Sequence, residues 1–406
     1  MTGLLDRQRI VIIGLSITST WGNGHATTYR GLVRELVRRR HQVTFLEREA
    51  SCFAINRDLP EPAYGTTIIY GSVDELRQKH AELVRTADLV IVGSRVPEGI
   101  EIGHWVCSTA KGSTAFYDLE TPVTLEALDA GTCTYLSEGL VPRFDVYLSF
   151  TGGPTLDRIE RHYGAQRARA FYCSFDPGAY QPDARTPAWD LGYMGTYCAS
   201  RQPGLQRLML AAAGVAPDLR FVVAGPAYPE DTSWPATVSR IGHVPAAEHR
   251  GFYTSQRFTL NLTRADMVRA GYSPSARLFE AAACGVPIVS DYWDGIETIF
   301  RPGTDILIAE SSRDTLRYLR ETPEAERVII GRRARRRVLA EHTAEHRAVE
   351  LENHLSELQR PARSAWRPVY DLTPAIAEYC ATSREQTRDI ERPGVSTVLV
   401  PRFTTA

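Results

Sequence analysis

Segments typical of buried strands alternate with segments typical of helices along most of this chain. In the first half, the residue pattern predicts strands at 10–13, 42–46, 89–92, 113–117, 146–150 and 170–173. Helices are expected between them at 27–40, 73–86, 100–109 and 156–163. Strands that alternate with helices form parallel sheets whose two faces are covered by the helices. The first half is therefore expected to be a doubly wound α/β domain.

A proline-containing segment at 176–188 interrupts this alternation, which then starts again. The second half predicts strands at 191–194, 219–224, 258–262 and 287–290, helices at 203–213 and 246–254, and a long helical stretch at 313–358. A chain of 406 residues accommodates two domains of ordinary size. The expected fold class is α/β, with two Rossmann-like doubly wound domains facing each other across a cleft. The expected boundaries are a first domain at 1–175, a linker at 176–188 and a second domain at 189–360. A tail at 361–406 follows, and it could cross back to the first domain.

The composition limits the expected partners and compartment. The 47 basic and 48 acidic residues nearly cancel, which gives no sign of a polyanionic partner such as nucleic acid. Seven cysteines without a Cys-x-x-Cys pair favour free thiols in a reducing compartment. Neither a leader peptide nor an apolar stretch of membrane-spanning length is evident, so a soluble cytoplasmic protein is expected. Because lysine occurs only at 79 and 111, any phosphate clamp must use arginine.

The segment from Tyr272 to Asp291 carries the clearest chemical signal. It predicts a loop, a short helix with Arg277 and Glu280, a Gly-Val-Pro turn and a buried strand. A helix N-terminus binds phosphate, and an arginine can hold it with two parallel hydrogen bonds. A carboxylate on the same helix can accept hydrogen bonds from a ribose diol. The segment therefore predicts a nucleotide site, with an alanine-rich helix packed on a sheet as the purely structural alternative.

Three weaker motifs leave other chemistries open. Gly22 and Gly24, with Glu47 further on, resemble part of a dinucleotide-binding fingerprint, but Thr27 replaces the third glycine. The pair Asp118-Leu-Glu120 resembles an acidic metal-binding pair. The segment His342-Thr-Ala-Glu345-His346 matches a zinc-protease pattern but follows an arginine-rich run that is expected to be a solvated helix face.

Four motifs together resemble those of glycosyltransferases with the GT-B fold, in particular the spore-maturation-type family. They are Trp-Gly-Asn-Gly-His-Ala-Thr-x-Tyr-Arg from Trp21, Tyr-Asp-x-x-Thr-Pro from Tyr117, Ser-Phe-Thr-Gly-Gly-Pro-Thr-Leu from Ser149, and Tyr-Ser-Pro-Ser-x-Arg-Leu-Phe-Glu-Ala-Ala-x-Cys-Gly from Tyr272. The similarity extends over residues 10–358. It implies an enzyme that moves a sugar from a nucleoside-diphosphate sugar to a hydroxyl or amine acceptor, with no required metal or other cofactor.

The resemblance also implies roles for individual residues. His25 would take the proton of the acceptor, since a histidine near neutral pKa suits a general base, and Asp118 would orient it. A helix cap or a hydroxyl-binding residue is the alternative for His25. The residues expected to bind the donor are Gly195, Arg201, Ser275, Arg277, Leu278 and Glu280. The residues expected at the acceptor or along the cleft are Trp21, Asn23, Gly24, Tyr272 and Asp294.

One position departs from the family pattern. Tyr272 stands where a broader retaining family has a glutamate that contacts the donor sugar, so neither sugar identity nor stereochemistry follows from the resemblance. The expected partners are a nucleotide-sugar donor such as a UDP-sugar and a small-molecule or cell-surface acceptor, with no nucleic acid and with an oligomer possible. The alternatives are an NAD-dependent oxidoreductase and a catalytically inactive nucleotide-sugar-binding relative.

Overall fold

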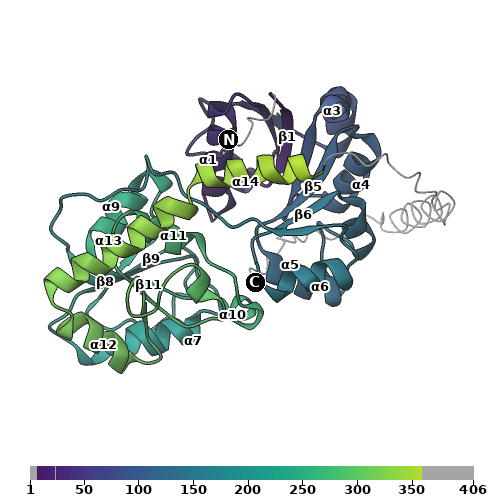
Figure 1. Cartoon of the computed structure of the whole chain (residues 1–406). Helices are drawn as coiled ribbons and strands as arrows, with labels where there is room; N and C mark the ends of the chain where they lie inside the picture. The colour runs from purple at the N-terminus through teal and green to yellow at the C-terminus, as the bar shows by residue number, and fades with distance from the viewer. Residues whose placement is uncertain (1–6, 23, 359–406) are drawn as a thin grey trace, which may run out of the picture. The chain divides into compact units, whose positions relative to one another are not determined.

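Two parallel sheets organise the chain (Figure 1). The computed structural model describes residues 7–22 and 24–358. The first sheet has seven strands in the order β3-β2-β1-β4-β5-β6-β7, and the second has six in the order β10-β9-β8-β11-β12-β13. Every pair of neighbouring strands in the two sheets is parallel. The predicted α/β class with two doubly wound sheets is confirmed.

The first sheet and its helices come from the N-terminal half of the chain. Its strands are β1 (Arg9–Gly14), β2 (Gln42–Arg48), β3 (Thr66–Tyr70), β4 (Leu89–Gly93), β5 (Ser113–Asp118), β6 (Val146–Ser149) and β7 (Ala168–Ala170). Its helices are α1 (His25–Arg38), α2 (Ser51–Ala54), α3 (Val73–Thr86), α4 (Gly99–Thr109), α5 (Thr121–Asp129) and α6 (Pro154–Arg161). The sequence pattern missed the short strand β3 and the helix α5.

The second sheet is built in the same way. Its strands are β8 (Trp189–Met194), β9 (Phe221–Ala224), β10 (Val238–Ile241), β11 (Gln256–Asn261), β12 (Ile288–Ser290) and β13 (Leu307–Ile308). Its longer helical segments are α7 (Gln202–Leu205), η2 (Gln206–Leu210), α8 (Ala211–Val215), α9 (His249–Thr254), α10 (Ala265–Ala270), α11 (Ala276–Ala283), α12 (Ser312–Glu321) and α13 (Glu324–Glu341).

Central strands in both sheets are apolar along their whole length because helices cover both faces. All five residues of β4, Leu-Val-Ile-Val-Gly, are buried, as are all four of β9, Phe-Val-Val-Ala. Parallel strands buried on both faces lose the alternation of polar and apolar residues. This is why uninterrupted apolar runs located the strands in the sequence.

The predicted helical stretch at 313–358 is divided into three helices, α12, α13 and α14 (Ala344–Glu357). Pro323 lies at the N-cap of α13, and proline disfavours helical conformation in the residue before it. Thr343 begins α14, where its side chain accepts a hydrogen bond from the backbone N–H of His346. The predicted helical stretch is therefore helical over most of its length, with interruptions at 322–323 and 342–343.

Helix α14 packs against α1, so the chain returns to the first half before the described residues end. Arg39 binds Glu352 through both carboxylate oxygens at 2.7 and 2.6 Å, and His41 contacts the same carboxylate at 2.8 Å. The proposed tail at 361–406 lies outside the described residues. Within the described part of the chain, no helix combines the length and apolarity needed to cross a membrane.

Candidate functional site

The strand order of each sheet contains one point at which successive strands are added on opposite sides. Such a point is called a topological switch point. Ligands of doubly wound proteins bind beyond the carboxyl ends of the strands at this point. In the first sheet this point lies between β1 and β4, and in the second it lies between β8 and β11. His25 begins the helix that follows β1, and the loops after β4, β8 and β11 contain Arg95, Arg201 and Arg264, respectively.

The turn after β8 is packed tightly against the end of β9. The Gly195 N–H donates to the Ala224 carbonyl at 2.8 Å. A Cβ atom at Gly225 would lie 2.1 Å from the Gly195 carbonyl oxygen, and Gly225 has φ +138°. A Cβ atom at Gly195 would itself lie 3.1 Å from Nη2 of Arg277. The turn therefore brings half-buried backbone close to an arginine from another element, as a phosphate site requires.

Arg277 is held in place by contacts from two strands, β8 and β11. Its Nε donates to the Met194 carbonyl at 2.6 Å, and its Nη1 donates to Oδ1 of Asn261 at 3.0 Å. Its guanidinium carbon lies 5.0 Å from the centre of the Tyr193 ring. Among the ion pairs of the described residues, none involves Arg277. The fixed guanidinium thus keeps a charge that no carboxylate of residues 7–22 or 24–358 neutralises.

Arg201 is a second arginine without a carboxylate partner within the described chain. Its Nη2 donates to the Thr196 carbonyl at 2.9 Å, whereas its buried Nε has no hydrogen-bond partner. A buried cation is costly unless an opposite charge accompanies it. Arg201 and Arg277 both contact the segment 194–196, so an anion bound beside this segment would satisfy both.

The N-terminus of α11 is also available to an anion. Ser275 occupies the N-cap position but does not cap the helix with its side chain. Its hydroxyl instead donates to Oδ1 of Asn261 at 2.8 Å, the same oxygen that Arg277 contacts. The first amides of a helix have no intrahelical acceptor, so they remain free to bind phosphate. Leu278 is fully buried and anchors this helix in the core.

Glu280 does not present a free carboxylate. Its Oε1 accepts a hydrogen bond from the Tyr180 hydroxyl at 3.1 Å, and its Oε2 accepts one from the Tyr253 hydroxyl at 3.0 Å. Nδ1 of His249 lies 3.9 Å from Oε2, and Glu280 is only 6% exposed. The sequence predicted a carboxylate open to a ribose diol, whereas the structure shows one already shared by two tyrosines.

His25 is the first residue of α1 and is buried, with Gly24 at the preceding N-cap position. Burial lowers its pKa below 6.5, the charge of Glu120 acts in the opposite direction, and Arg95 lowers the pKa further. An imidazole in this setting is neutral at pH 7 and able to accept a proton. Its position beyond β1 at the first switch point agrees with the place predicted for a base.

Asp118 has other partners than the one predicted. It is completely buried at the end of β5 and accepts hydrogen bonds from the Tyr147 hydroxyl, from Thr124 Oγ1 at 2.8 Å and from the Glu120 N–H at 3.1 Å. Burial raises its pKa to about 6. The carboxylate whose charge acts on His25 belongs to Glu120 instead.

Glu120 lies among cations from both halves of the chain. Arg95 donates to its Oε2 at 2.5 Å, and Nη1 of Arg264 lies 3.7 Å from its Oε1. Burial alone would raise the pKa of Glu120, but His25, Arg95 and Arg264 hold it below its usual range. Sequence reasoning considered Glu120 only as a metal ligand and missed both arginines. The signal was available, because His25, Arg95 and Arg264 each follow a strand at one of the two switch points.

The residues predicted to lie along the cleft differ in their surroundings. The Trp21 ring lies 4.9 Å from the His243 ring, which follows β10, and Trp21 is 40% exposed. Asp294 is exposed, and its carbonyl accepts a hydrogen bond from the Tyr272 N–H at 2.6 Å. Asn23 lies outside the described residues.

Tyr272 joins the two halves of the chain. It has φ +47°, which is unusual for a residue with a side chain. Its ring packs on Gly153 and Gly295, because a Cβ atom at these glycines would lie 2.3 and 2.4 Å from ring carbons. Its carbonyl accepts the Gly152 N–H at 2.9 Å.

The weaker motifs do not form the sites that they resemble. Glu47 accepts hydrogen bonds from Ser16, Ile17 and Thr18, so it shapes the loop after β1. His342 ends α13, and its ring stacks on Phe279 at 4.8 Å. In the portion of the chain that the structure covers, no group of three or more His, Cys, Asp or Glu side chains is arranged to hold a metal ion.

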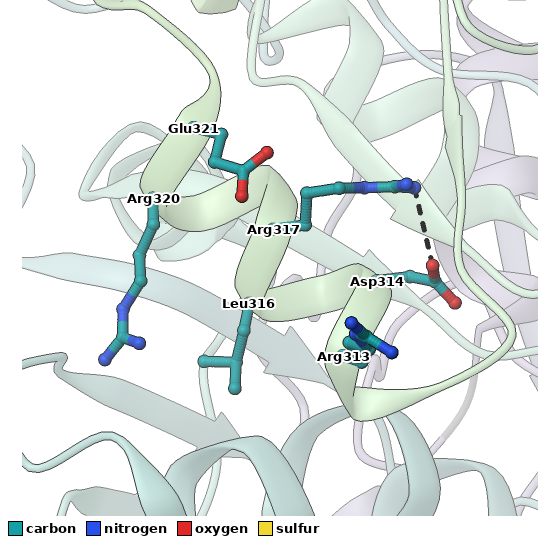
Figure 2. Close-up of a pocket in the computed structure, with 6 residues that line it drawn as sticks. All are labelled: Arg313, Asp314, Leu316, Arg317, Arg320 and Glu321. Carbon is teal, nitrogen blue, oxygen red and sulfur yellow. Dashed lines mark ion pairs between the residues drawn. The ribbon is translucent and has the colours of Figure 1, made fainter.

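Two cavities lie apart from the switch points. One, of about 510 Å³, is lined only by α12, where Arg317 reaches Asp314 at 3.4 Å (Figure 2). The other, of about 410 Å³, lies between Tyr172 and the junction of α13 with α14. Neither is lined by a residue expected at the donor, the acceptor or the cleft, and the second is lined by His342 and His346 of the zinc-protease-like motif.

Comparison with solved structures identifies the architecture. An α-glucosyltransferase bound to UDP and DNA matches with a TM-score of 0.67 and 15% identity, over 86% of this chain and 99% of that one. Sucrose-phosphate synthase from Thermosynechococcus elongatus matches with a TM-score of 0.65 and 14% identity, over 87% and 99% of the two chains. HepE of Anabaena, bound to UDP and glucose, matches with a TM-score of 0.65 and 12% identity, over 86% and 100%.

The fold is that of the GT-B glycosyltransferases. Residues 201–353 also match the family model described as glycosyl transferase-like, which begins at Arg201 and includes α11. No curated protein sequence matches the chain. The expected resemblance to GT-B glycosyltransferases is confirmed.

One expectation about partners is corrected by the same comparison. Near-neutral net charge suggested that nucleic acid is not a partner, yet three of the similar GT-B structures are α-glucosyltransferases in complex with DNA. The exclusion was wrong because net charge describes the whole surface and not the acceptor side of one cleft. The GT-B fold accommodates nucleic acid as well as small molecules.

Proposed function

We propose that this protein transfers a sugar from a nucleoside-diphosphate sugar to a hydroxyl group. The observation that carries the proposal is the pair Arg201 and Arg277, which have no carboxylate partner in the described chain and lie beside the uncapped N-terminus of α11. A diphosphate is the anion that fits two arginines and a helix N-terminus at a switch point. The GT-B fold and the UDP bound to HepE support this choice of ligand.

The same residues would stabilise the leaving group. The acceptor oxygen attacks the anomeric carbon, the bond from that carbon to the diphosphate oxygen breaks, and the electron pair stays on the diphosphate. Arg201, Arg277 and the α11 amides stabilise the negative charge that develops there. His25 accepts the acceptor proton, and Glu120 stabilises the imidazolium that forms. Because two arginines supply the positive charge, we propose that transfer requires no metal ion.

Binding experiments test the donor site first. Isothermal titration with UDP, TDP, GDP and the corresponding nucleosides should show one preferred diphosphate that binds more tightly than its nucleoside. Absence of binding by all three diphosphates would overturn the proposal. Saturable NAD binding without diphosphate binding would favour an oxidoreductase instead, although the hydrogen bonds at Glu47 argue against that alternative.

Turnover experiments then define the acceptor and the metal requirement. Release of the nucleoside diphosphate from its sugar conjugate should be followed with water, with hydroxylated small molecules and with DNA that carries a hydroxymethyl base. Transfer to a small molecule is the proposed outcome, and transfer to the modified DNA alone would redirect the proposal to a nucleic-acid acceptor. Unchanged rates in EDTA are expected. Diphosphate binding without any turnover would indicate an inactive relative.

A further inference from the structure

Arg264 lies between the two halves of the proposed site. It follows β11 at the switch point of the second sheet, and its Nη1 is 3.7 Å from Glu120 of the first half. Its charge also lowers the pKa of Cys198, which precedes Arg201 in the phosphate-side loop. Arg264 is therefore close to the carboxylate that acts on His25, and it follows β11, the neighbour of the strand β8 that leads into the loop with Arg201.

Two ion pairs of Arg264 are longer than the one that Arg95 makes with Glu120. Arg95 lies 2.5 Å from Glu120, whereas Arg264 lies 3.7 Å from Glu120 and 3.8 Å from Asp266. A guanidinium at these longer distances gains less from each carboxylate. An incoming diphosphate carries a larger negative charge than either carboxylate alone, so it would compete well for Arg264.

We propose that Arg264 is a positioning residue that couples donor binding to the proton acceptor His25. When the diphosphate binds beside Arg201, Arg264 turns from Glu120 to the phosphate. Glu120 then shares its charge only with Arg95 and His25, and the imidazole becomes a better proton acceptor once the donor is in place. This inference rests on the proposed function, because it requires a diphosphate at the second switch point.

The electrostatic surroundings determine the sign of the effect. Glu120 and Arg95 are the charged groups that act on His25, and Arg264 acts on Glu120. Asp118 also faces Glu120, but its carboxylate is held by Tyr147 and Thr124. Removing a positive charge from Glu120 leaves more of its negative charge to stabilise protonated His25. Donor binding is therefore expected to raise the pKa of His25.

The test measures the His25 pKa by NMR of protein with ¹³C-labelled histidine, with and without UDP, after assignment by loss of the signal in His25→Gln. In the wild type, UDP should raise the pKa of His25 by about 1 unit, the lower end of the effect of a nearby opposite charge. In Arg264→Ala, the pKa should already be raised without UDP and should change little when UDP is added. Arg264→Lys should restore a partial response.

A matched control and an affinity measurement complete the design. Arg269→Ala removes an exposed arginine from the adjoining helix α10, where it pairs with Glu126, and should behave as the wild type. Arg264→Ala should weaken UDP binding about 10-fold, the lower bound for a charged hydrogen bond. If UDP binds but shifts the His25 pKa equally in the wild type and in Arg264→Ala, or in neither, the coupling is refuted while the donor site stands. If UDP, TDP and GDP all fail to bind, the proposed function fails, and this inference fails with it.

Discussion

The ring of Tyr272 packs directly on the backbone of Gly153, and this contact joins a loop of the second half to a turn of the first. A Cβ atom at Gly153 would lie 2.3 Å from a carbon of the ring. Next to it, the hydroxyls of Thr151 and Ser273 are 2.8 Å apart and buried. The segment Thr151–Gly153 and the segment Tyr272–Ser273 therefore fit each other only while Gly153 lacks a side chain.

Gly153→Ala is expected to destabilise the protein more than a glycine substitution at an open turn. Gly153 has φ +59°, so alanine would be strained there and would also overlap the Tyr272 ring. Gly131→Ala is the matched control, because Gly131 has φ +65° but nothing within 4 Å of a Cβ atom. Thermal and urea unfolding should show an additional loss of about 1–3 kcal/mol for Gly153→Ala, the usual cost of overpacking. Equal losses in the two variants would show that the ring contact adds nothing.

The fold was predictable from sequence because its strands are buried on both faces. Runs such as Leu89–Gly93 and Phe221–Ala224 are apolar without alternation, and each is followed by a helix or by a loop that contains polar or charged side chains. The order of these elements placed Arg201, Arg277 and His25 at carboxyl ends of strands. Pro323 marks one of the two interruptions of the last helical stretch in the sequence itself.

The partners of the acidic residues were not predictable, because they depend on tertiary contacts. Asp118 and Glu120 are separated by a single residue. The Tyr147 hydroxyl on the neighbouring strand β6 donates a hydrogen bond to the carboxylate of Asp118. Glu280 is held by Tyr180 and Tyr253, which are distant from it in the chain. No local pattern in the sequence reports which hydroxyl will reach which carboxylate.

Arg277→Ala should separate diphosphate recognition from nucleoside recognition. The guanidinium is expected to contact phosphate, so UDP affinity should fall roughly 10- to 100-fold, the range that corresponds to one charged hydrogen bond. Uridine affinity should stay nearly unchanged in the same titrations. Arg313→Ala, a change on α12 away from the switch points, is a suitable control. A matching loss for uridine and UDP would indicate that Arg277 acts through its structural bonds to Met194 and Asn261.

The unfolding free energy of the wild type should fall relative to that of Asp118→Asn as the pH rises. Burial raises the pKa of Asp118 from 3.8 to about 6, so the folded state favours its protonated form. Its contribution to stability is fully present below pH about 4 and is lost as the pH rises through about 6. The difference in unfolding free energy, wild type minus variant, should fall by about 2 kcal/mol between pH 4 and 7, which is most of the total expected at 1.36 kcal/mol per pKa unit. Urea unfolding of both proteins at pH 4, 5, 6 and 7 measures this, and a flat or rising difference would contradict it.

His25→Ala should abolish the proposed proton transfer without affecting donor binding. Turnover should fall by about 10²–10⁴-fold, the usual contribution of a positioned base, while UDP affinity stays within error. Because burial lowers the pKa of His25, the rising limb of kcat/KM in the wild type should have its midpoint below pH 6.5. Glu120→Gln should move that midpoint to still lower pH, because it removes the charge that raises the pKa of His25. His162→Ala, at an exposed position after α6, should leave both the rate and the limb unchanged. A His25→Ala enzyme with near-normal turnover would exclude the base role and would favour a mechanism in which the leaving phosphate accepts the proton.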